Sequence, residues 1–309
     1  MNMKNTKRQG ALALAVVLAA GILAGCATGG PSPAPGTNPA DAPTGGSNPG
    51  QSQQGAITVI SREEGSGTRG AFVEILGVVD SEGDDATVQT AEIVNATSVV
   101  SQTVAGNKAA IGYVSMGAMD GGVKALAVSG VEATVEQVKA GAYPVSRPFN
   151  LCYRADKITD LGKDFLTFIQ SAEGQAILAE KYIAVQDNAP AYTPAGLGGN
   201  LSLNGSTSVG PVMMELAEAY MARNEGVTID VQQTGSGAGI TATIDGTCEI
   251  GMSSRDLKEE ELAEGLTSER IALDGIAVIV NPENPVDNLS KEQIRDIFLG
   301  QITDWSELS

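Results

Sequence analysis

Four loops of this sequence combine serine, threonine and glycine at points where a helix is expected to begin. A loop of this kind directs unpaired backbone N–H groups and the positive end of a helix dipole toward one point, and its hydroxyl groups add further donors. Such a set of donors suits an oxyanion that is held without a metal ion. The four loops are Ser61–Arg69, Gly205–Ser208, Gly235–Gly239 and Met252–Asp256.

One such loop is ordinary, because serine and threonine are common N-caps and glycine is common in turns. Four of them in one chain favour convergence on a single anion. Arg62 lies in the first loop, and its guanidinium can bind a tetrahedral oxyanion through two parallel hydrogen bonds. An ion pair with Glu63 or Glu64 is the alternative for this arginine. None of the loops has the Gly-x4-Gly-Lys-Ser/Thr spacing of a nucleotide-binding P-loop.

The composition excludes several kinds of catalytic site. The chain contains no histidine, which rules out Ser-His-Asp and Cys-His catalysis and most zinc sites. Cys152 and Cys248 lack the spacing of a metal site, and two buried thiols are favoured over a disulfide. A phosphate-ester hydrolase with Ser66 or Ser254 as nucleophile is the enzymatic alternative, but it lacks a histidine base and a carboxylate cluster for metals. We therefore expect no enzymatic activity, no cofactor and no metal.

The chain is strongly acidic, with a formal net charge of −18. This charge argues against nucleic acid as a partner. It does not prevent a small anion from binding, because neighbouring N–H donors act at contact range whereas distant charges are screened by salt.

The elements that must position these loops alternate between strands and helices, which favours an α/β fold. Before a linker rich in Ala, Pro, Gly and Asn at about 186–200, we expect strands at 57–60 and 110–115, helices at 68–76, 94–106 and 161–171, and a helical turn at 173–175. After the linker we expect a β-α-β-α-β unit over 201–251, with helices at 209–223 and 238–245, then a strand at 271–280 and a helix at 291–298.

The first 55 residues contain signals for export and anchoring. Basic residues precede an apolar run at 11–23 that is too short to span a bilayer, as in a signal peptide. Leu23-Ala24-Gly25-Cys26 resembles the bacterial lipobox, so we expect 1–26 to be a lipoprotein signal peptide and Cys26 to carry acyl chains such as palmitate. Residues 27–55 have the composition of a disordered linker. We therefore expect the protein on the extracytoplasmic face of the cell membrane; an ordinary secretory signal is the alternative.

Much of the chain resembles the phosphate-binding protein of the high-affinity phosphate ABC transporter. The resemblance rests on the loop REEGSGTR at 62–69 and on the longer stretches 57–76, 109–120, 203–257 and 271–305. It implies a two-lobed periplasmic-binding-protein-like fold of type II with the ligand in the cleft between the lobes. It also implies a monomeric, non-catalytic protein that captures inorganic phosphate for membrane permease subunits.

The order of the segments differs from the usual order of that family. The segment that resembles the family's beginning, 201–305, follows the segment that resembles its end, 57–185, so the resemblance predicts a circular permutation joined by the linker at 186–200. We expect one discontinuous lobe made of 56–113 plus 281–309, and one continuous lobe at 114–280. The alternative is a sequence cut from a tandem pair.

The resemblance places the expected phosphate ligands on all four of the loops described above. The expected ligands are Arg62, Ser66, Gly67, Thr68, Thr207, Ser208, Ser236 and Ser254. The best-known members of the family carry an aspartate at the position of Ser254, and that carboxylate accepts the proton that phosphate has and sulfate lacks.

A replacement acceptor is expected if the cleft selects phosphate. Asp274, in an apolar strand, is the first candidate, because an isolated buried charge is costly without a partner. An ion pair of Asp274 with Arg255 or another arginine is the alternative, and Glu64 is the second candidate. A different ligand, such as a sulfate-like anion or a phosphonate, and a non-transporting sensor or adhesin of the same fold are the alternative functions.

Overall fold

The computed structural model describes residues 55–119, 121–186 and 188–308, all of which belong to one compact unit, Ser52–Ser309. The expected signal peptide, Cys26 and nearly all of the linker at 27–55 lie outside the described residues. Among the residues that are described, no helix has both the length and the hydropathy needed to cross a membrane.

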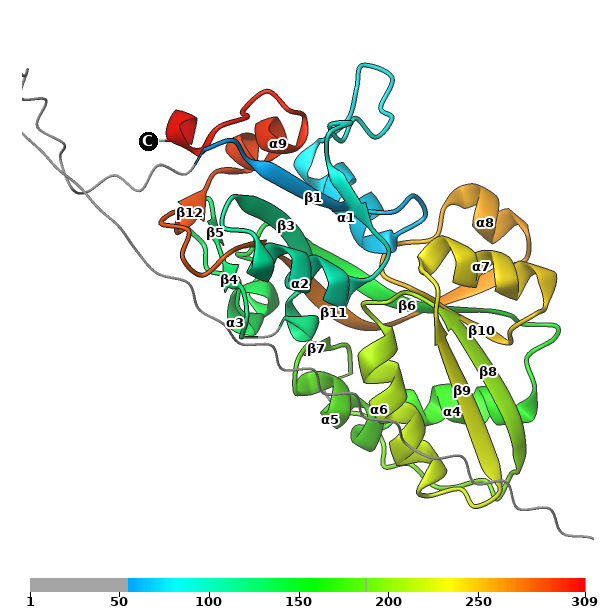
Figure 1. The fold of residues 1–309 in the computed structure, drawn as a ribbon. Coiled ribbons are helices and arrows are strands. Elements are labelled where there is room, and N and C mark those ends of the chain that lie inside the picture. Colours follow the sequence, from blue (N-terminus) through cyan, green and yellow to red (C-terminus); the bar gives the residue numbers. More distant parts are fainter. Residues whose placement is uncertain (1–54, 120, 187, 309) are drawn as a thin grey trace, which may run out of the picture. The chain divides into compact units, whose positions relative to one another are not determined.

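A mixed sheet with the strand order β2-β1-β3-β11-β6-β10-β8-β9 organises this unit (Figure 1). The pairs of β1 with β2 and β3, and of β8 with β9 and β10, are parallel, whereas β11 is antiparallel to β3 and β6. The eight strands are β1 Thr58–Arg62, β2 Glu92–Val94, β3 Ala110–Ser115, β6 Ser146–Arg154, β8 Gly199–Gly205, β9 Val227–Gln233, β10 Ile250–Ser253 and β11 Leu266–Val280. Two-residue strands β4 Lys124–Ala125 and β7 Ile183–Ala184 also pair with β11, whereas β5 Ala127–Val128 and β12 Asn288–Leu289 form a separate two-stranded sheet.

The helices follow the strands in the alternation that the sequence predicts. They are α1 Gly67–Leu76, α2 Thr97–Gly106, α3 Val135–Lys139, α4 Asp160–Ile169, α5 Ala172–Ala179, α6 Gly210–Met221, α7 Ser236–Asp245, α8 Glu259–Ala263 and α9 Lys291–Phe298. The predictions for 110–115 and 291–298 are confirmed to the residue. The helix expected from residue 94 begins at Thr97 instead, because Val94 pairs with Arg62 at the end of β2.

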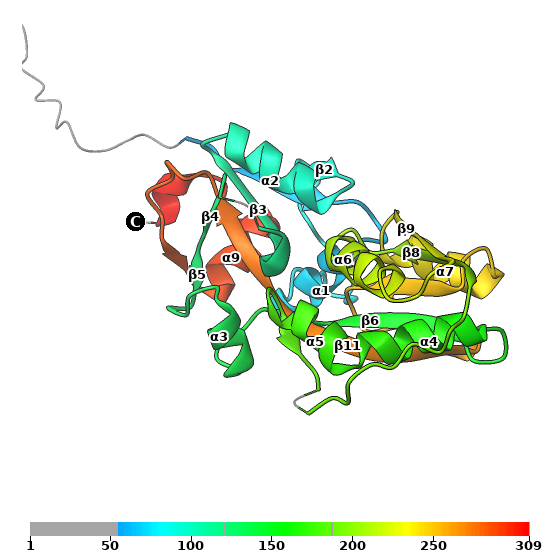
Figure 2. The same cartoon turned by 90° about the horizontal axis from the view of Figure 1, so that it is seen from below.

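The fold has two main hydrophobic cores, and the strands β6 and β11 connect them. One contains side chains between Phe149 and Ala272, and the other is built from residues up to Val145 and from Ile276 onward. Figures 1 and 2 show the two groups of elements joined by these strands. We call residues 57–145 plus 275–308 the first lobe, and residues 146–274 the second.

These boundaries differ from the division expected at 114 and 280. Leu126, Val138 and Ile276 pack in the first lobe, whereas the expectation put them in the second. The reason is that β11 is one continuous strand of 15 residues whose two halves contribute to different cores. The change between lobes therefore falls inside a strand, where no loop marks it in the sequence.

The two ends of the described chain lie side by side in the first lobe. The Ile57 backbone N–H donates to the Thr303 carbonyl oxygen at 2.8 Å, and Ala56 forms a bridge with Asp304. The indole N–H of Trp305 donates to the Ala109 carbonyl oxygen at 3.0 Å. Adjacent ends are what a circular permutation at this loop requires, although the permutation itself stays a prediction.

Tyr192 fixes the linker between the two halves of the sequence onto the second lobe. Its hydroxyl group lies 2.5 Å from an Asp164 carboxylate oxygen, and its ring packs against Phe168 and Tyr220. We expect Tyr192→Ala to lower the free energy of unfolding by about 3 kcal/mol through the loss of this packing. Urea unfolding monitored by circular dichroism measures the change. Tyr192→Phe, which keeps the ring, should lose only about 1 kcal/mol, and equal losses would contradict the packing explanation.

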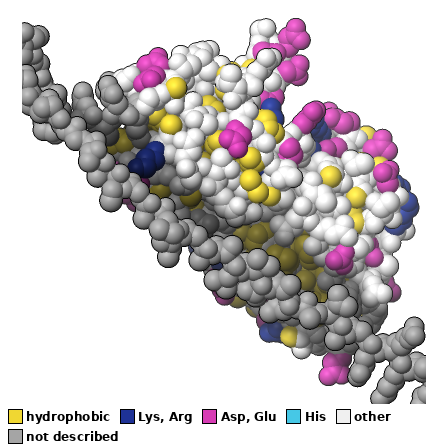
Figure 3. Space-filling view, in the orientation of Figure 1, with side chains coloured by type: hydrophobic (Ala, Val, Ile, Leu, Met, Phe, Trp, Pro, Cys, Tyr) yellow, Lys and Arg dark blue, Asp and Glu magenta, His cyan; other side chains and the backbone are white. Residues whose placement is uncertain are grey.

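The surface agrees with the acidic composition. On the face shown in Figure 3, acidic side chains are scattered among neutral ones, and no broad basic patch is visible.

Candidate anion-binding site

The predicted loops of both lobes meet in the structure. In the second lobe, β10 and β9 flank β8 in parallel, so the loops after all three strands leave the same edge of the sheet. The loop after β1 reaches them from the first lobe: a Cβ atom at Gly67 would collide with the hydroxyl oxygens of Ser236 and Ser254. The Gly237 backbone N–H also donates to the Gly65 carbonyl oxygen at 2.9 Å. Only a residue without a side chain fits at position 67.

Hydroxyl groups form direct contacts between the lobes at this point. Thr68 Oγ1 of the first lobe lies 2.9 Å from Ser208 Oγ of the second, and within the second lobe Ser236 Oγ lies 3.3 Å from Ser254 Oγ. All these side chains are buried, as is Ser66, which caps α1 by accepting a hydrogen bond from the Arg69 backbone N–H. The structure therefore brings together eight of the nine residues predicted to bind the anion: Arg62, Ser66, Gly67, Thr68, Thr207, Ser208, Ser236 and Ser254.

Arg62 forms the ion pair with Glu63 that was considered for it, and it also contacts the second lobe. Its guanidinium binds the Glu63 carboxylate through two bonds of 2.9 and 2.8 Å, and the same group donates to Thr207 Oγ1 at 3.1 Å. The side chain is 1% exposed. The Tyr113 hydroxyl accepts from the Arg62 backbone N–H and contacts Ser61, which fixes the end of β1. Glu63 therefore holds the buried Arg62 side chain in a position where it contacts Thr207 of the second lobe.

Thr97 is a member of this cluster that the sequence analysis missed. Its hydroxyl oxygen lies 3.3 Å from Arg62 Nη1, 3.0 Å from Thr207 Oγ1 and 3.1 Å from Ser208 Oγ. The residue is 3% exposed and is the first residue of α2. The segment before α2 contains no glycine-rich motif that could have identified it.

Asp274, the ninth predicted residue, lies in a buried ion pair. Its carboxylate accepts from Arg147 Nε and Nη2 at 3.2 and 3.0 Å and from Ser115 Oγ at 3.0 Å. Burial raises its pKa to about 6, and the charge of Arg147 opposes that shift. The ion pair considered in the sequence analysis therefore exists, but with Arg147, because Arg255 instead pairs with Glu261. Through Arg147, the pair reaches the Ser254 carbonyl oxygen at 3.3 Å.

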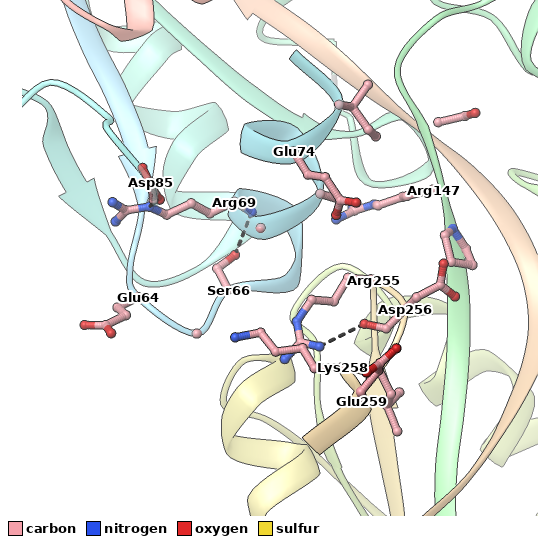
Figure 4. A pocket seen from close by; sticks show the side chains of 17 residues that line it. Glu64, Ser66, Arg69, Glu74, Asp85, Arg147, Arg255, Asp256, Lys258 and Glu259 are labelled. Carbon is pink, nitrogen blue, oxygen red and sulfur yellow. Dashed lines mark hydrogen bonds and ion pairs between the residues drawn. The ribbon is translucent and has the colours of Figure 1, made fainter. Parts of the chain in front are cut away.

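A groove of about 830 Å³ lies beside these loops (Figure 4). Ser66, Arg69, Arg147, Arg255 and Lys258 are among the residues that line it. Glu64, the second candidate acceptor, is exposed and also lines the groove. The groove is therefore continuous with residues of the anion cluster.

The chemistry available in this cluster is hydrogen-bond donation to an anion. Hydroxyl groups, an arginine and helix N-termini converge from two lobes, which is the donor set expected for an oxyanion. Within the described ranges, no group of three or more Cys, Asp or Glu side chains could hold a metal ion. Cys152 and Cys248 are buried and free, which confirms the prediction of two thiols.

Comparisons with known proteins agree with this geometry. A family model described as a PBP superfamily domain matches residues 17–173 and 190–309. Phosphate-binding protein PstS 2 of Streptococcus agalactiae is 41% identical over 99% of this chain and 100% of its own length. The protein of the same name from Streptococcus pneumoniae is 47% identical over 84% of this chain and 89% of its own length. The chain belongs to this family of phosphate-binding proteins.

A solved structure from the family supports the fold. The crystal structure of a phosphate-binding protein of a phosphate ABC transporter from Streptococcus pneumoniae has a TM-score of 0.67 and 46% sequence identity, and it covers 82% of this chain and all of its own. The two-lobed α/β fold of the binding-protein class is thereby confirmed. Because the alignment with the Streptococcus agalactiae relative spans both proteins almost completely, that relative has the same order of segments as this phosphate-binding protein.

Proposed function

We propose that this chain captures inorganic phosphate between its two lobes and delivers it to the permease of an ABC importer, without catalysing a reaction. The observation that carries the proposal is the convergence of Arg62 and buried hydroxyl groups from both lobes on one point. Membership of the phosphate-binding protein family and the names of the relatives support phosphate as the ligand.

Because hydrogen-bond donors come from both lobes, a bound anion would favour the form in which the two lobes are closed around it. An anion that accepts hydrogen bonds from Thr68 on the first lobe and from Ser208 on the second stabilises the closed form more than any open one. Since β6 and β11 connect the lobes, they are the expected hinge. The permease would then distinguish the closed, loaded form from the open one.

Neither of the two expected proton acceptors, Asp274 and Glu64, offers a free buried carboxylate, so selectivity for phosphate over sulfate is the weakest feature of the site. Both oxygens of Asp274 are engaged by Ser115 and Arg147, and Glu64 is exposed. We therefore propose that sulfate is rejected less strongly than in relatives with an aspartate at the position of Ser254. A phosphonate or sulfate-like ligand is the alternative outcome of a competition experiment.

Uptake measurements test the transport role. Cells that lack the gene should take up labelled phosphate more slowly at low external concentration, and a plasmid copy should restore the rate. Unchanged uptake would favour a surface sensor or adhesin.

We also propose that acyl chains on Cys26 hold the monomer on the extracytoplasmic face of the membrane. Cells grown with labelled palmitate should yield a purified protein that carries the label. Purified protein without label would contradict this anchoring.

Thr97 should contribute directly to phosphate affinity. Thr97→Val keeps the shape of the side chain but removes the hydroxyl group that contacts Arg62, Thr207 and Ser208. We expect phosphate to bind roughly 10- to 100-fold more weakly, since one hydrogen bond to a charged group is worth about 1.5–3 kcal/mol. Calorimetric titration measures the change. Thr97→Ser should bind as the natural protein does, and so should Thr103→Val on the same helix; equal losses in all three would contradict the role of the hydroxyl group.

A further inference from the structure

Arg147 and Asp274 form an ion pair at the point where the two lobes join. They face each other across the antiparallel pair of β6 and β11, and each side chain is 1% exposed. Taking two charges out of water is expensive, and such a pair often stabilises a protein no more than apolar residues of the same size would. The contribution of this pair to stability therefore does not explain its presence.

The guanidinium of Arg147 extends from this pair to the anion cluster. Its Nη1 donates to the Ser254 carbonyl oxygen at 3.3 Å, and the Ser254 hydroxyl group faces Ser236 and the space that Gly67 leaves open. Figure 4 shows Arg147 reaching from β6 toward α1, the helix that begins at Gly67. Arg147 is therefore a second buried cation, after Arg62, and it contacts the backbone of the predicted ligand loop at Ser254.

Two buried arginines, Arg62 and Arg147, contact the loops of the anion cluster, Arg62 at Thr207 and Arg147 at Ser254. Burial lowers the pKa of Arg147 most, the charge of Arg62 lowers it further, and Asp274 opposes both. Each arginine has one carboxylate partner, Glu63 or Asp274. An anion near both guanidinium groups would offset their positive charges. Arg147 can also donate to it, because a guanidinium has five N–H groups and three bonds to protein atoms engage Arg147.

We propose that Arg147 is a second arginine of the anion site and that Asp274 positions it. This inference rests on the proposed function, since it assumes that the cleft binds phosphate. Arg147 adds positive charge and N–H donors from β6, in addition to those of Arg62, which Glu63 binds. Asp274 orients the guanidinium and offsets its charge, which limits the affinity for a fully ionised anion such as sulfate.

A double variant tests the proposal without leaving a buried charge unpaired. Arg147→Met alone would strand the Asp274 carboxylate in the core, so we combine it with Asp274→Leu, which removes both charges at similar volume. The full-length chain, stripped of bound anion by unfolding and refolding, is titrated with inorganic phosphate in a calorimeter. We expect phosphate to bind at least tenfold more weakly, while the thermal midpoint of the ligand-free protein stays within a few degrees of the natural one.

A matched control separates this effect from the general loss of an ion pair. Lys181→Met with Glu215→Leu removes an ion pair of 2.8 Å in the second lobe, and neither of these residues lines the groove or belongs to one of the four loops. We expect this variant to bind phosphate as tightly as the natural protein. A folded Arg147/Asp274 double variant that also does so would overturn the proposal.

Asp274→Asn provides a result of opposite sign. This variant keeps the Arg147 charge, and the amide oxygen can still accept a hydrogen bond from the guanidinium and hold it in place. Because the negative charge that offsets Arg147 is gone, sulfate should bind about tenfold more tightly than to the natural chain. If Asp274→Asn weakens the binding of both anions as much as the double variant does, the pair is only structural and the proposal fails. If the natural chain does not bind phosphate, the proposed function fails as well, which distinguishes the two claims.

Discussion

Replacing Arg62 by methionine is expected to weaken phosphate binding by a factor of roughly 100 to 1,000. Arg62 is buried and its guanidinium binds Glu63, Thr97 and Thr207, so the variant loses the cation and leaves the Glu63 carboxylate without its partner. Truncating one member of a buried, hydrogen-bonded charge pair costs about 3–5 kcal/mol. Calorimetric titration with phosphate measures the loss.

Two further variants show whether charge or geometry matters at this position. Arg62→Lys keeps the charge but cannot form two parallel bonds to a carboxylate or an oxyanion, so we expect it to recover only part of the affinity. Arg295→Met, in the same lobe, removes an arginine that is 40% exposed and pairs with Asp296, and it should bind phosphate normally. Normal binding by Arg62→Met would exclude this arginine from the site.

The second large effect is expected from Gly67→Ala. The added methyl group would collide with the hydroxyl oxygens of Ser236 and Ser254, which belong to the opposite lobe. If β6 and β11 act as the proposed hinge, the lobes separate in the ligand-free form, so the variant should fold normally but should be unable to close fully around the anion. Forcing a methyl group into a packed contact costs about 1–3 kcal/mol, which corresponds to a loss of affinity of roughly 10- to 100-fold.

Gly70→Ala is the matched control for this prediction. It adds the same methyl group to the same helix, where the nearest atom of the opposite lobe, Arg255 Cδ, lies at an ordinary contact distance of 3.5 Å. Phosphate affinity should stay within a factor of about two in this variant. Equal affinities in Gly67→Ala and Gly70→Ala would mean that the lobes do not approach each other in the bound state as they do in this structure.

The sequence predicted the loops of the anion site because their signal is local. A strand end, a run of Ser, Thr and Gly, and a helix start lie within about ten residues of each other, so the REEGSGTR loop and the loops at Thr207 and Ser236 could be identified one by one. The structure adds that they come from two lobes and meet at Gly67. Their convergence depends on strand order, which no single loop reveals.

The residues that the sequence analysis missed depend on contacts between distant segments. Arg147 lies on β6, which contains Pro148, a residue without an N–H for the strand ladder, and no strand was predicted there. Its pairing with Asp274 spans 127 positions in the sequence. Thr97 opens an ordinary helix, and only tertiary structure places its hydroxyl group beside Thr207. The lobe boundary was misplaced for a similar reason, because β11 passes through both cores without a break.

Calorimetric titration of the natural chain with phosphate and then with sulfate tests the central claim most directly. The full-length protein must first be unfolded and refolded to remove any anion that was purified with it. We predict saturable binding of one phosphate per chain with a dissociation constant in the micromolar range or below, about −8 kcal/mol or stronger, and weaker binding of sulfate. Absence of a phosphate response in a protein that has refolded to its native circular dichroism spectrum would contradict the account, even though the family assignment would stand.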